Sequence, residues 1–233
     1  MIRALSLVLL LTQAPPAPQD PTSEVTGVVR YGGIRRPRNM NAQVDAMKHG
    51  TPPRGDKDVF NEDILLGEKG ELANVLVRVK DSMKGEFAPP KEAVVLDALG
   101  YFFKPRVVVV QSGQKLVLKN SGLDNVNFHV KARRNKEVNV GIARGHSREA
   151  SFPLAESGFP VQHDCCPWQI AWIHVLEHPF WAITGADGSF KIKGLPAGTY
   201  EIEACHEVFG VLSTKVTVDG KDSKTHDFAF EGK

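Results

Sequence analysis

The side chains best suited to chemistry lie in the short run from His163 to Gln169, which reads H-D-C-C-P-W-Q. An imidazole at His163 and a thiol at Cys166 stand three residues apart, and both groups are common ligands of transition metals. The third of the three cysteines is Cys205, and an odd number of cysteines leaves at least one thiol unpaired. Two interpretations stay open: a metal site that uses Cys166, or a disulfide that joins Cys165 or Cys166 to Cys205.

The sequence lacks the motifs of common enzyme classes. It contains no G-x-S-x-G, H-E-x-x-H, P-loop or dinucleotide-binding fingerprint, and the adjacent cysteines lack the C-x-x-C spacing of thiol oxidoreductases. His206-Glu207 is an isolated pair, which is more often a turn or an ion pair than a catalytic dyad. We therefore expect that the protein is not an enzyme.

The first residues predict export from the cytoplasm. Residues 1–14 contain Arg3, an apolar run and small residues near Ala14, which is the pattern of a cleaved signal peptide. This apolar run is the longest in the sequence and is about half of the roughly 20 residues that a membrane-spanning helix needs. The formal net charge of +2 shows no excess of basic residues for nucleic-acid binding. We expect a periplasmic or extracellular protein with no membrane span and no nucleic-acid partner.

Turn signals and apolar or β-branched segments alternate along most of the chain, which predicts an all-β fold. The expected strands are residues 25–30, 73–79, 106–110, 115–120, 171–176, 180–183, 189–192, 199–205, 211–218 and 226–230. Short helices are expected only at residues 41–48 and 59–65. The first lies within, and the second overlaps the end of, a long surface excursion over residues 34–63, which is rich in Pro, Arg, Asn and Asp.

The run I-T-G-A-D-G-S-F-K-I-K-G-L-P-A-G-T-Y at residues 183–200 resembles the hairpin of the carboxypeptidase regulatory-like β-sandwich family. The first two strands of that family, of types G-x-V and V-x-V, are matched by residues 27–29 and 74–79. About a hundred residues separate these early strands from the hairpin, which is enough for an inserted second domain. The resemblance therefore predicts a split sandwich made from residues 23–85 and 179–233.

The inserted stretch, residues 88–178, resembles the cupredoxins, in particular exported plastocyanin-like proteins of the methylamine-utilisation type. The resemblance rests on G-Y-F-F-K-P at 100–105, G-Q-K-L at 113–116, N-S at 120–121, D-C-C-P-W-Q at 164–169 and H-P-F at 178–180. It implies a type 1 copper ion held by two His, a Cys and a Met. The predicted architecture is a cupredoxin-like Greek-key sandwich inserted in a split carboxypeptidase regulatory-like β-sandwich.

Every ligand position of that family is changed in this sequence. When the shared Pro-Trp is aligned, the family's Cys, His and Met fall on His163, Cys166 and Gln169. The first His of the family falls on Asp124. A thiol and an imidazole are therefore both present, but at exchanged positions.

The metal interpretation gives these residues new roles. Cys166 provides the thiolate, His163 provides an imidazole, and Gln169 provides a weak axial oxygen. Asp124 or the nearby His129 is the third ligand. With His129 the set suits a blue-copper centre, and with Asp124 it is closer to a zinc-like site.

Two functions are expected from these alternatives. The first is a divergent cupredoxin that binds copper or another metal and passes electrons to an envelope protein or redox partner. The second is a metal-free module of the cell envelope, either structural or binding a carbohydrate or protein through Trp168, Trp172 and Trp181. The state of Cys166 separates the two, because the second function leaves this thiol disulfide-bonded or inert.

Overall fold

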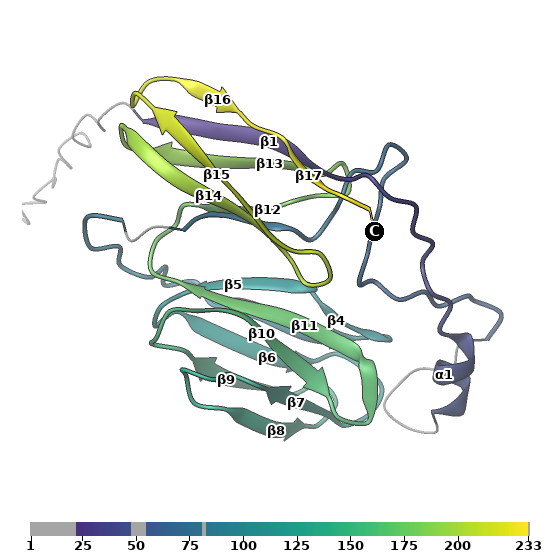
Figure 1. Ribbon diagram of the computed structural model, residues 1–233. Helices are drawn as coiled ribbons and strands as arrows, with labels where there is room; N and C mark the ends of the chain where they lie inside the picture. The colour runs from purple at the N-terminus through teal and green to yellow at the C-terminus, as the bar shows by residue number, and fades with distance from the viewer. Residues whose placement is uncertain (1–21, 48–54, 81–82, 233) are drawn as a thin grey trace, which may run out of the picture.

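The structure is a computed structural model that describes residues 22–47, 55–80 and 83–232. These residues form two stacked β-sandwiches and one short helix (Figure 1), so the prediction of an all-β fold is confirmed. The predicted signal peptide, residues 1–14, lies outside the described residues. Within them, no helix combines the length and the apolar character that crossing a membrane requires.

The upper sandwich in Figure 1 is built from both ends of the described chain. Its outer sheet has the order β13-β1-β16, and β17 also pairs with β1. Its inner sheet has the order β12-β2-β14-β15. Side chains from both sheets, among them Val29, Phe190 and Ile202, form one buried core. The strands are β1 (Ser23–Tyr31), β2 (Leu76–Val79), β12 (Trp181–Ile183), β13 (Ser189–Leu195), β14 (Gly198–His206), β15 (Gly210–Val218), β16 (Ser223–Thr225) and β17 (Phe228–Phe230).

The lower sandwich contains the strands between β2 and β12. One sheet has the order β5-β11-β10-β7-β8 and the other has the order β4-β3-β6-β9. Their shared core includes Phe103 and Phe128, whose rings stack across the two sheets with centroids 4.7 Å apart. The strands are β3 (Val94–Leu99), β4 (Phe102–Lys104), β5 (Val107–Gln111), β6 (Lys115–Asn120), β7 (Val126–Val130), β8 (Val138–Ile142), β9 (Ser147–Ser151), β10 (Glu156–His163) and β11 (Cys166–Leu176).

The two sandwiches meet along an apolar interface, which we call the waist. Leu76 of β2 packs there against Val107, Val109 and Leu176 of the lower sandwich. The alternate side chains of β5 face the lower core, so every residue of this strand is buried. Burial on both faces accounts for the uninterrupted apolar sequence V-V-V-V in β5.

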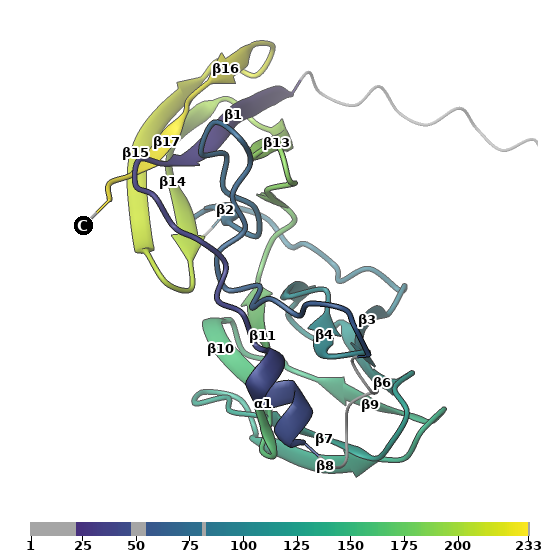
Figure 2. The ribbon, with the colours of Figure 1, turned by 90° about the vertical axis from the view of Figure 1, so that its right-hand side faces the viewer.

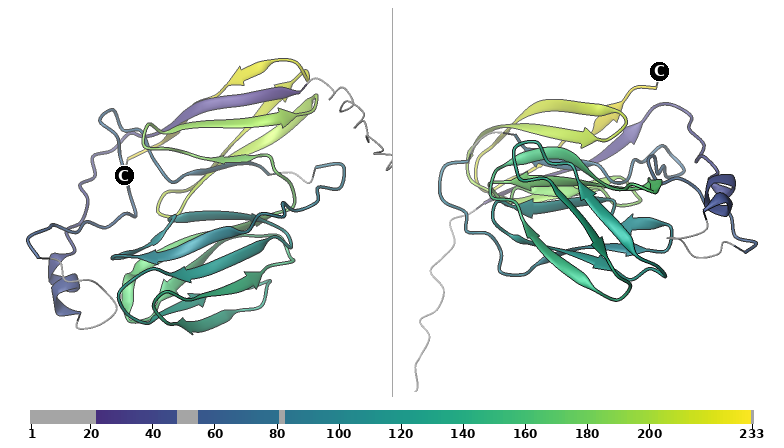
Figure 3. Two further views of the ribbon diagram at one scale, coloured as in Figure 1. Left: turned by 180° about the vertical axis from the view of Figure 1, so that it is seen from behind. Right: turned by 90° about the horizontal axis from the view of Figure 1, so that it is seen from below.

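The long excursion after β1 runs from the upper sandwich to the end of the lower one, as the side view in Figure 2 and the views from behind and below in Figure 3 show. It carries α1 (Asn41–Ala46), which confirms the predicted helix at residues 41–48 as far as Ala46. Met40 and Val44 pack against Cys166 and Trp168. The excursion is therefore more than a surface segment, because it covers one end of the lower sandwich.

The predicted helix at residues 59–65 is wrong. The N–H of Val59 donates to the side-chain oxygen of Asn41, and the carbonyl of Val59 accepts a bond from the N–H of Met40. The N–H of Asn61 donates to the carbonyl of Arg38. These partners, supplied by the other arm of the excursion, replace the bonds that a helix would make within the segment.

Each predicted strand overlaps an observed one, but several strands were missed. They are β3, β4, β7, β8, β9, β10 and β16. The strand β9 is almost fully exposed, and β10 contains Gly158 and Pro160, which are unusual within strands. Their sequences therefore carry little of the alternation that identifies a half-buried strand.

Candidate functional site

His163 and Cys166, two of the predicted metal ligands, face each other across the turn of the β10–β11 hairpin. They pair directly in the strand ladder, whereas the next pair is Gln162 with Ile170, so residues 167–169 bulge out of β11. Cys166 is fully buried beneath α1. Burial, with a smaller contribution from the neighbouring Cys165, raises the pKa of the Cys166 thiol to about 11. A thiol in this state is protonated at neutral pH and unreactive.

The imidazole of His163 is held in one orientation by Asn127. Its Nδ1 lies 2.6 Å from Oδ1 of Asn127, and that oxygen also accepts the N–H of Asp164 at 3.0 Å. The amide nitrogen of Asn127 donates to Asp164, so the amide orientation is fixed and Nδ1 of His163 is the donor. Burial lowers the pKa of His163, so the ring is neutral and carries a lone pair on Nε2.

His129 lies between two carboxylates. Its Nε2 lies 2.6 Å from Oε1 of Glu137, and its Nδ1 lies 2.9 Å from Oδ1 of Asp164. These two hydrogen bonds, Glu137 first, raise the pKa of His129 above its ordinary value. Because both ring nitrogens are engaged, His129 has no lone pair to offer a metal ion.

Asp124 and Gln169 complete the predicted ligand set. The side chain of Asp124 accepts the N–H of Asn125, and its carbonyl accepts the amide of Asn120. The Oε1 atom of Gln169 and the Nε1 atom of Trp168 are buried and have no hydrogen-bond partner among the described residues. The bulge after Cys166 therefore contains an unpartnered oxygen, which is a property expected of a weak axial ligand.

The structure does not bring the predicted ligands into one site. In the described part of the chain, no group of three or more His, Cys, Asp and Glu side chains is arranged to hold a metal ion. His163, Cys166 and Gln169 lie on one hairpin end, but a blue-copper centre needs a second imidazole. His129, the other histidine of the predicted ligand set, is bonded to carboxylates. The residues present therefore do not fit type 1 copper.

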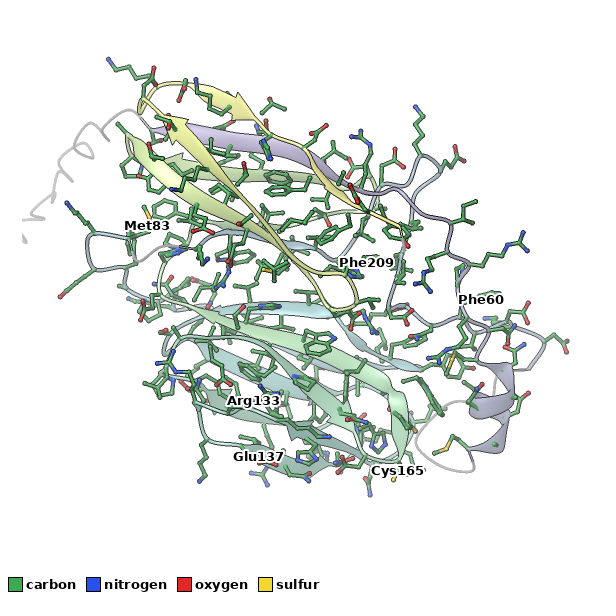
Figure 4. All side chains as sticks on the ribbon, viewed as in Figure 1. Phe60, Met83, Arg133, Glu137, Cys165 and Phe209 are labelled. Carbon is green, nitrogen blue, oxygen red and sulfur yellow. The ribbon has the colours of Figure 1, made fainter. Side chains whose placement is uncertain are left out.

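No disulfide joins the cysteines. Cys165, Cys166 and Cys205 are all free. Cys205 lies on β14 and packs at the waist, whereas Figure 4 shows Cys165 at the hairpin end of the lower sandwich beside α1. The disulfide interpretation is therefore not supported, because the two ends of the proposed bond belong to different sandwiches.

Thiol labelling tests these assignments. We expect the native protein to react with a thiol reagent at Cys165, which is exposed, and much more slowly at Cys166 and Cys205. Burial raises the pKa of both slow thiols to about 11, which removes the reactive thiolate. Mass spectrometry of native and denatured samples measures the sites. A Cys165→Ser variant should lose the rapid reaction, and rapid labelling of Cys166 in it would contradict the structure.

The three tryptophans do not form one surface. Trp168 packs beneath α1, and Trp181 packs at the waist against Leu76. Trp172 alone is placed beside the buried ion pair of the waist. The predicted tryptophan-lined face is therefore reduced to a single ring.

Arg106 and Glu207 form this ion pair across the waist. Nε of Arg106 lies 2.5 Å from Oε1 of Glu207, and Nη2 lies 3.0 Å from Oε2. The indole N–H of Trp172 also donates to Oε2 of Glu207. The side chains of Arg106 and Glu207 are only 5% and 12% exposed. Glu207 therefore serves in an ion pair, as the isolated His206-Glu207 motif predicted, and it fixes the orientation of the Trp172 ring.

Beside this network lies a cleft of about 420 Å³ between the two sandwiches, which we call the waist cleft. Its wall includes Trp172 and His174 from the lower sandwich, Asn74 and Arg78 from the upper one, and His206. Asn74 is the only non-glycine among the described residues with a positive φ, at 61°. Asparagine tolerates this left-handed conformation, which elsewhere often marks a functional position.

His174 is one of the buried titratable groups of the waist cleft. Its Nδ1 lies 2.7 Å from the hydroxyl oxygen of Ser157. Burial, followed by the positive charge of Arg78, lowers the pKa of His174 to about 3. The ring is neutral at pH 7, and among the described residues its Nε2 has no partner. It can exchange hydrogen bonds with a ligand but is too weak a base to activate Ser157.

Comparisons with known proteins give a structural likeness and no sequence family. No protein-family profile and no curated protein matches the sequence. Part of the chain is similar in structure to cupredoxins. One is the copper-containing nitrite reductase of Thermus scotoductus SA-01, with TM-score 0.35, 14% identity, and coverage of 42% of this chain and 25% of that one. Another is a novel purple cupredoxin from Nitrosopumilus maritimus, with TM-score 0.29, 16% identity and coverage of 36% and 97%.

A third is a mutant of amicyanin in its reduced state, with TM-score 0.33, 14% identity and coverage of 42% and 97%. The chain thus spans a quarter of the nitrite reductase and nearly all of the two smaller proteins. This likeness is distant and covers about 40% of the chain. No function is taken from it.

Sequence reasoning missed most of the waist cleft. His174 lies on β11 and, among the described residues, is hydrogen-bonded to Ser157 through Nδ1 only. Asn74, Arg78 and Glu203 were not singled out, because nothing local in a sequence shows that a charged residue is buried at an interface. The signal that was present is Asn74 itself, a residue suited to positive φ directly before an apolar strand.

Proposed function

We propose that this protein is a non-catalytic carbohydrate-binding protein of the cell envelope, and that the waist cleft holds the sugar. The architecture that we propose is a cupredoxin-like domain, residues 88–178, inserted in a carboxypeptidase regulatory-like sandwich. Export by residues 1–14 is part of this proposal. The observation that carries it is the combination, in one cleft, of a fixed indole ring and polar groups that have no side-chain partner among the described residues.

Trp172 supplies the apolar surface for a sugar ring. Its N–H is bonded to Glu207, which is itself held by Arg106, so little side-chain entropy is lost when a ligand stacks on the indole. Aromatic side chains with an apolar face and an anchored polar edge are typical of ligand sites at domain interfaces.

Polar groups around the ring supply hydrogen bonds to sugar hydroxyls. In the described part of the chain, the amide of Asn74 and Nε2 of His174 have no side-chain partner, and both residues line the cleft. A neutral imidazole and an amide can each donate or accept, which suits hydroxyl groups. The remaining charged groups, such as Arg78 and Glu203, are paired with each other at 2.8 Å and give the cleft a fixed shape.

The pKa values of His174 and Cys205 in the waist cleft favour binding over catalysis. His174 is the base nearest to a hydroxyl, and its pKa of about 3 gives it little driving force to accept a proton. Burial raises the pKa of Cys205 to about 11, so this thiol is not a nucleophile. We do not propose electron transfer through copper, because His129 is bonded to carboxylates and His163 is the one imidazole of the predicted ligand set beside Cys166.

Replacing Trp172 tests the proposal. The protein should bind one or more oligosaccharides on an array, and isothermal titration with such a sugar should show at least tenfold weaker binding by Trp172→Ala, because the stacking surface is lost. Trp172→Phe is the matched control and should retain most of the affinity, since it keeps an aromatic face. Equal binding by Trp172→Ala and wild type, or no sugar bound by folded wild-type protein, would overturn the proposal.

A further inference from the structure

A second cleft of about 420 Å³ opens between the sandwiches next to the waist cleft, and its wall is basic. Four cationic side chains line it: Arg78 and Lys80 from the upper sandwich, and Arg133 and Arg134 from the β7–β8 loop of the lower one. We call it the basic cleft. The acidic residues on its wall are Glu156 and Glu177.

The cations of the upper sandwich are already neutralised. Arg78 lies 2.8 Å from Glu203, and Lys80 lies 3.0 Å from Glu201 and 3.3 Å from Glu203. These pairs leave no net charge for a ligand to compensate on that side.

The two arginines of the lower sandwich are not neutralised. Arg134 donates from Nη1 to the carbonyl of Ala155 at 2.8 Å. Among the described residues, neither guanidinium has a carboxylate within ion-pair distance, and that of Arg133 has no partner at all. Figure 4 shows Arg133 on the lower sandwich. Two adjacent guanidinium groups without an ion-pair partner on one cleft wall suit an anionic ligand.

Glu156 holds the loop that carries both arginines. Its carboxylate accepts the N–H of Arg133 at 2.7 Å, and those of Arg134 and Asn135 at 3.0 Å each. It also accepts the side-chain amide of Asn135 at 3.0 Å. The Glu156 carboxylate is thus committed to the main chain of the loop, which fixes the loop at the cleft before any ligand arrives.

The other titratable wall residues form no ion pair with the two arginines among the described residues. Burial lowers the pKa of His178, and its Nδ1 accepts the N–H of Phe180 at 3.2 Å, so this ring is neutral. Glu177 is exposed and forms no ion pair with a described residue. The guanidinium groups of Arg133 and Arg134 therefore form no direct ion pair with a described residue, while the carboxylates of Glu156 and Glu177 lie on the same wall.

The two clefts share Arg78 and Ser157 in their walls, so they are neighbours along the waist. We propose that the ligand is an acidic oligosaccharide: one sugar stacks on Trp172, and a carboxylate or sulfate group of the same chain binds Arg133 and Arg134. The planar fork of a guanidinium matches both oxyanions, and each contact is a charge-assisted hydrogen bond. This inference rests on the proposed function, because it names the class of sugar that the waist cleft takes.

Titration with trisaccharides of equal length tests this inference. The probes are a neutral galactose oligomer, a galacturonate oligomer and a sulfated galactose oligomer. We expect wild-type protein to bind at least one acidic oligomer at least tenfold more tightly than the neutral one. In Arg133→Gln/Arg134→Gln this difference should disappear while affinity for the neutral oligomer is kept. The uronate and sulfate probes show which oxyanion is preferred.

Arg144→Gln/Arg148→Gln is the matched control, because it removes the same charge from exposed arginines outside both clefts. It should keep the preference for the acidic oligomer at equal ionic strength. Arg133→Lys/Arg134→Lys keeps the charge and should retain part of the preference. Thermal unfolding verifies that each variant is folded.

The outcomes separate the two proposals. Equal affinity for neutral and acidic oligomers, with binding still dependent on Trp172, would overturn the inference and leave the proposed function standing. A loss of preference in the control variant as large as in Arg133→Gln/Arg134→Gln would show non-specific charge attraction and would also overturn it. Binding of none of the three oligomers would overturn the inference, and binding of no sugar on the array would overturn the proposed function as well.

Discussion

Glu207→Gln should lower the free energy of unfolding by about 3–5 kcal/mol, because it leaves the buried guanidinium of Arg106 without its counter-charge. Arg106 is only 5% exposed, so water cannot replace the lost carboxylate. The substitution also weakens the hydrogen bond that anchors the Trp172 indole. The affinity of the waist cleft for sugar should therefore decrease together with the stability. Urea denaturation at pH 7 measures the change in unfolding free energy.

The matched control is Glu149→Gln, which breaks the ion pair of Glu149 with Lys115. These two side chains are 63% and 59% exposed, and exposed pairs contribute only about 0–1 kcal/mol. Arg106→Met/Glu207→Leu removes both buried charges and should recover much of the stability lost in Glu207→Gln. A loss in Glu207→Gln no larger than in Glu149→Gln would contradict the buried network.

The protein should lose stability steeply as the pH falls below about 6.5, and His174 and His206 should account for much of the loss. Burial is the main cause that lowers their pKa values, to about 3 and about 4, and the charges of Arg78 and Arg106 add to it. In the unfolded chain both rings regain a pKa near 6.5. Between these values the unfolded state binds more protons, so falling pH favours unfolding.

The neutral, buried histidines contribute fully to the free energy of unfolding above about pH 6.5. This contribution is lost as the pH falls toward 4. Each pKa unit corresponds to about 1.4 kcal/mol, so the loss at pH 4 is on the order of 3 kcal/mol for each ring. His174→Asn/His206→Asn should flatten the dependence of unfolding free energy on pH between 7 and 4. Asparagine can still accept the hydrogen bonds that each Nδ1 makes with Ser157 and with the N–H of Val208.

Urea denaturation at several pH values, compared between variant and wild type, isolates this effect from the carboxylates that titrate in both proteins. His146→Asn is the control, because His146 is exposed and should leave the pH dependence unchanged. A double variant whose stability falls with pH as steeply as that of the wild type would show that the two rings are not buried in neutral form.

The part of the candidate site that the sequence could predict is local. His163 and Cys166 are close along the chain, and the structure pairs them across a hairpin turn. His129, predicted as an alternative third ligand, lies near this hairpin end, and its ring nitrogens bond to Glu137 and Asp164. A side chain's choice between a metal ion and a carboxylate depends on neighbours from other strands, which spacing in the sequence does not specify.

The sequence by itself determined the strands that have one buried face and the turns that join them. Phe190 and Ile192, which belong to the predicted hairpin at residues 183–200, alternate inward, and Asp187-Gly188 forms the turn before them. Gly188 has φ 67°, and a Cβ there would lie 2.5 Å from the carbonyl oxygen of Val29, so only glycine fits. Alternation and turn chemistry depend on residues that are close together in the chain, so both can be recognised from the sequence alone.

The tertiary structure alone decided which strands are buried on both faces and which charges pair. Arg106 and Glu207 are separated by 101 residues, and the clefts beside them exist only because β2 and β14 of one sandwich pack on β5 and β11 of the other. A polar or charged residue that is buried at this interface looks the same in the sequence as one at an exposed strand end. The difference lies in the second layer that covers them, and that layer comes from distant parts of the chain.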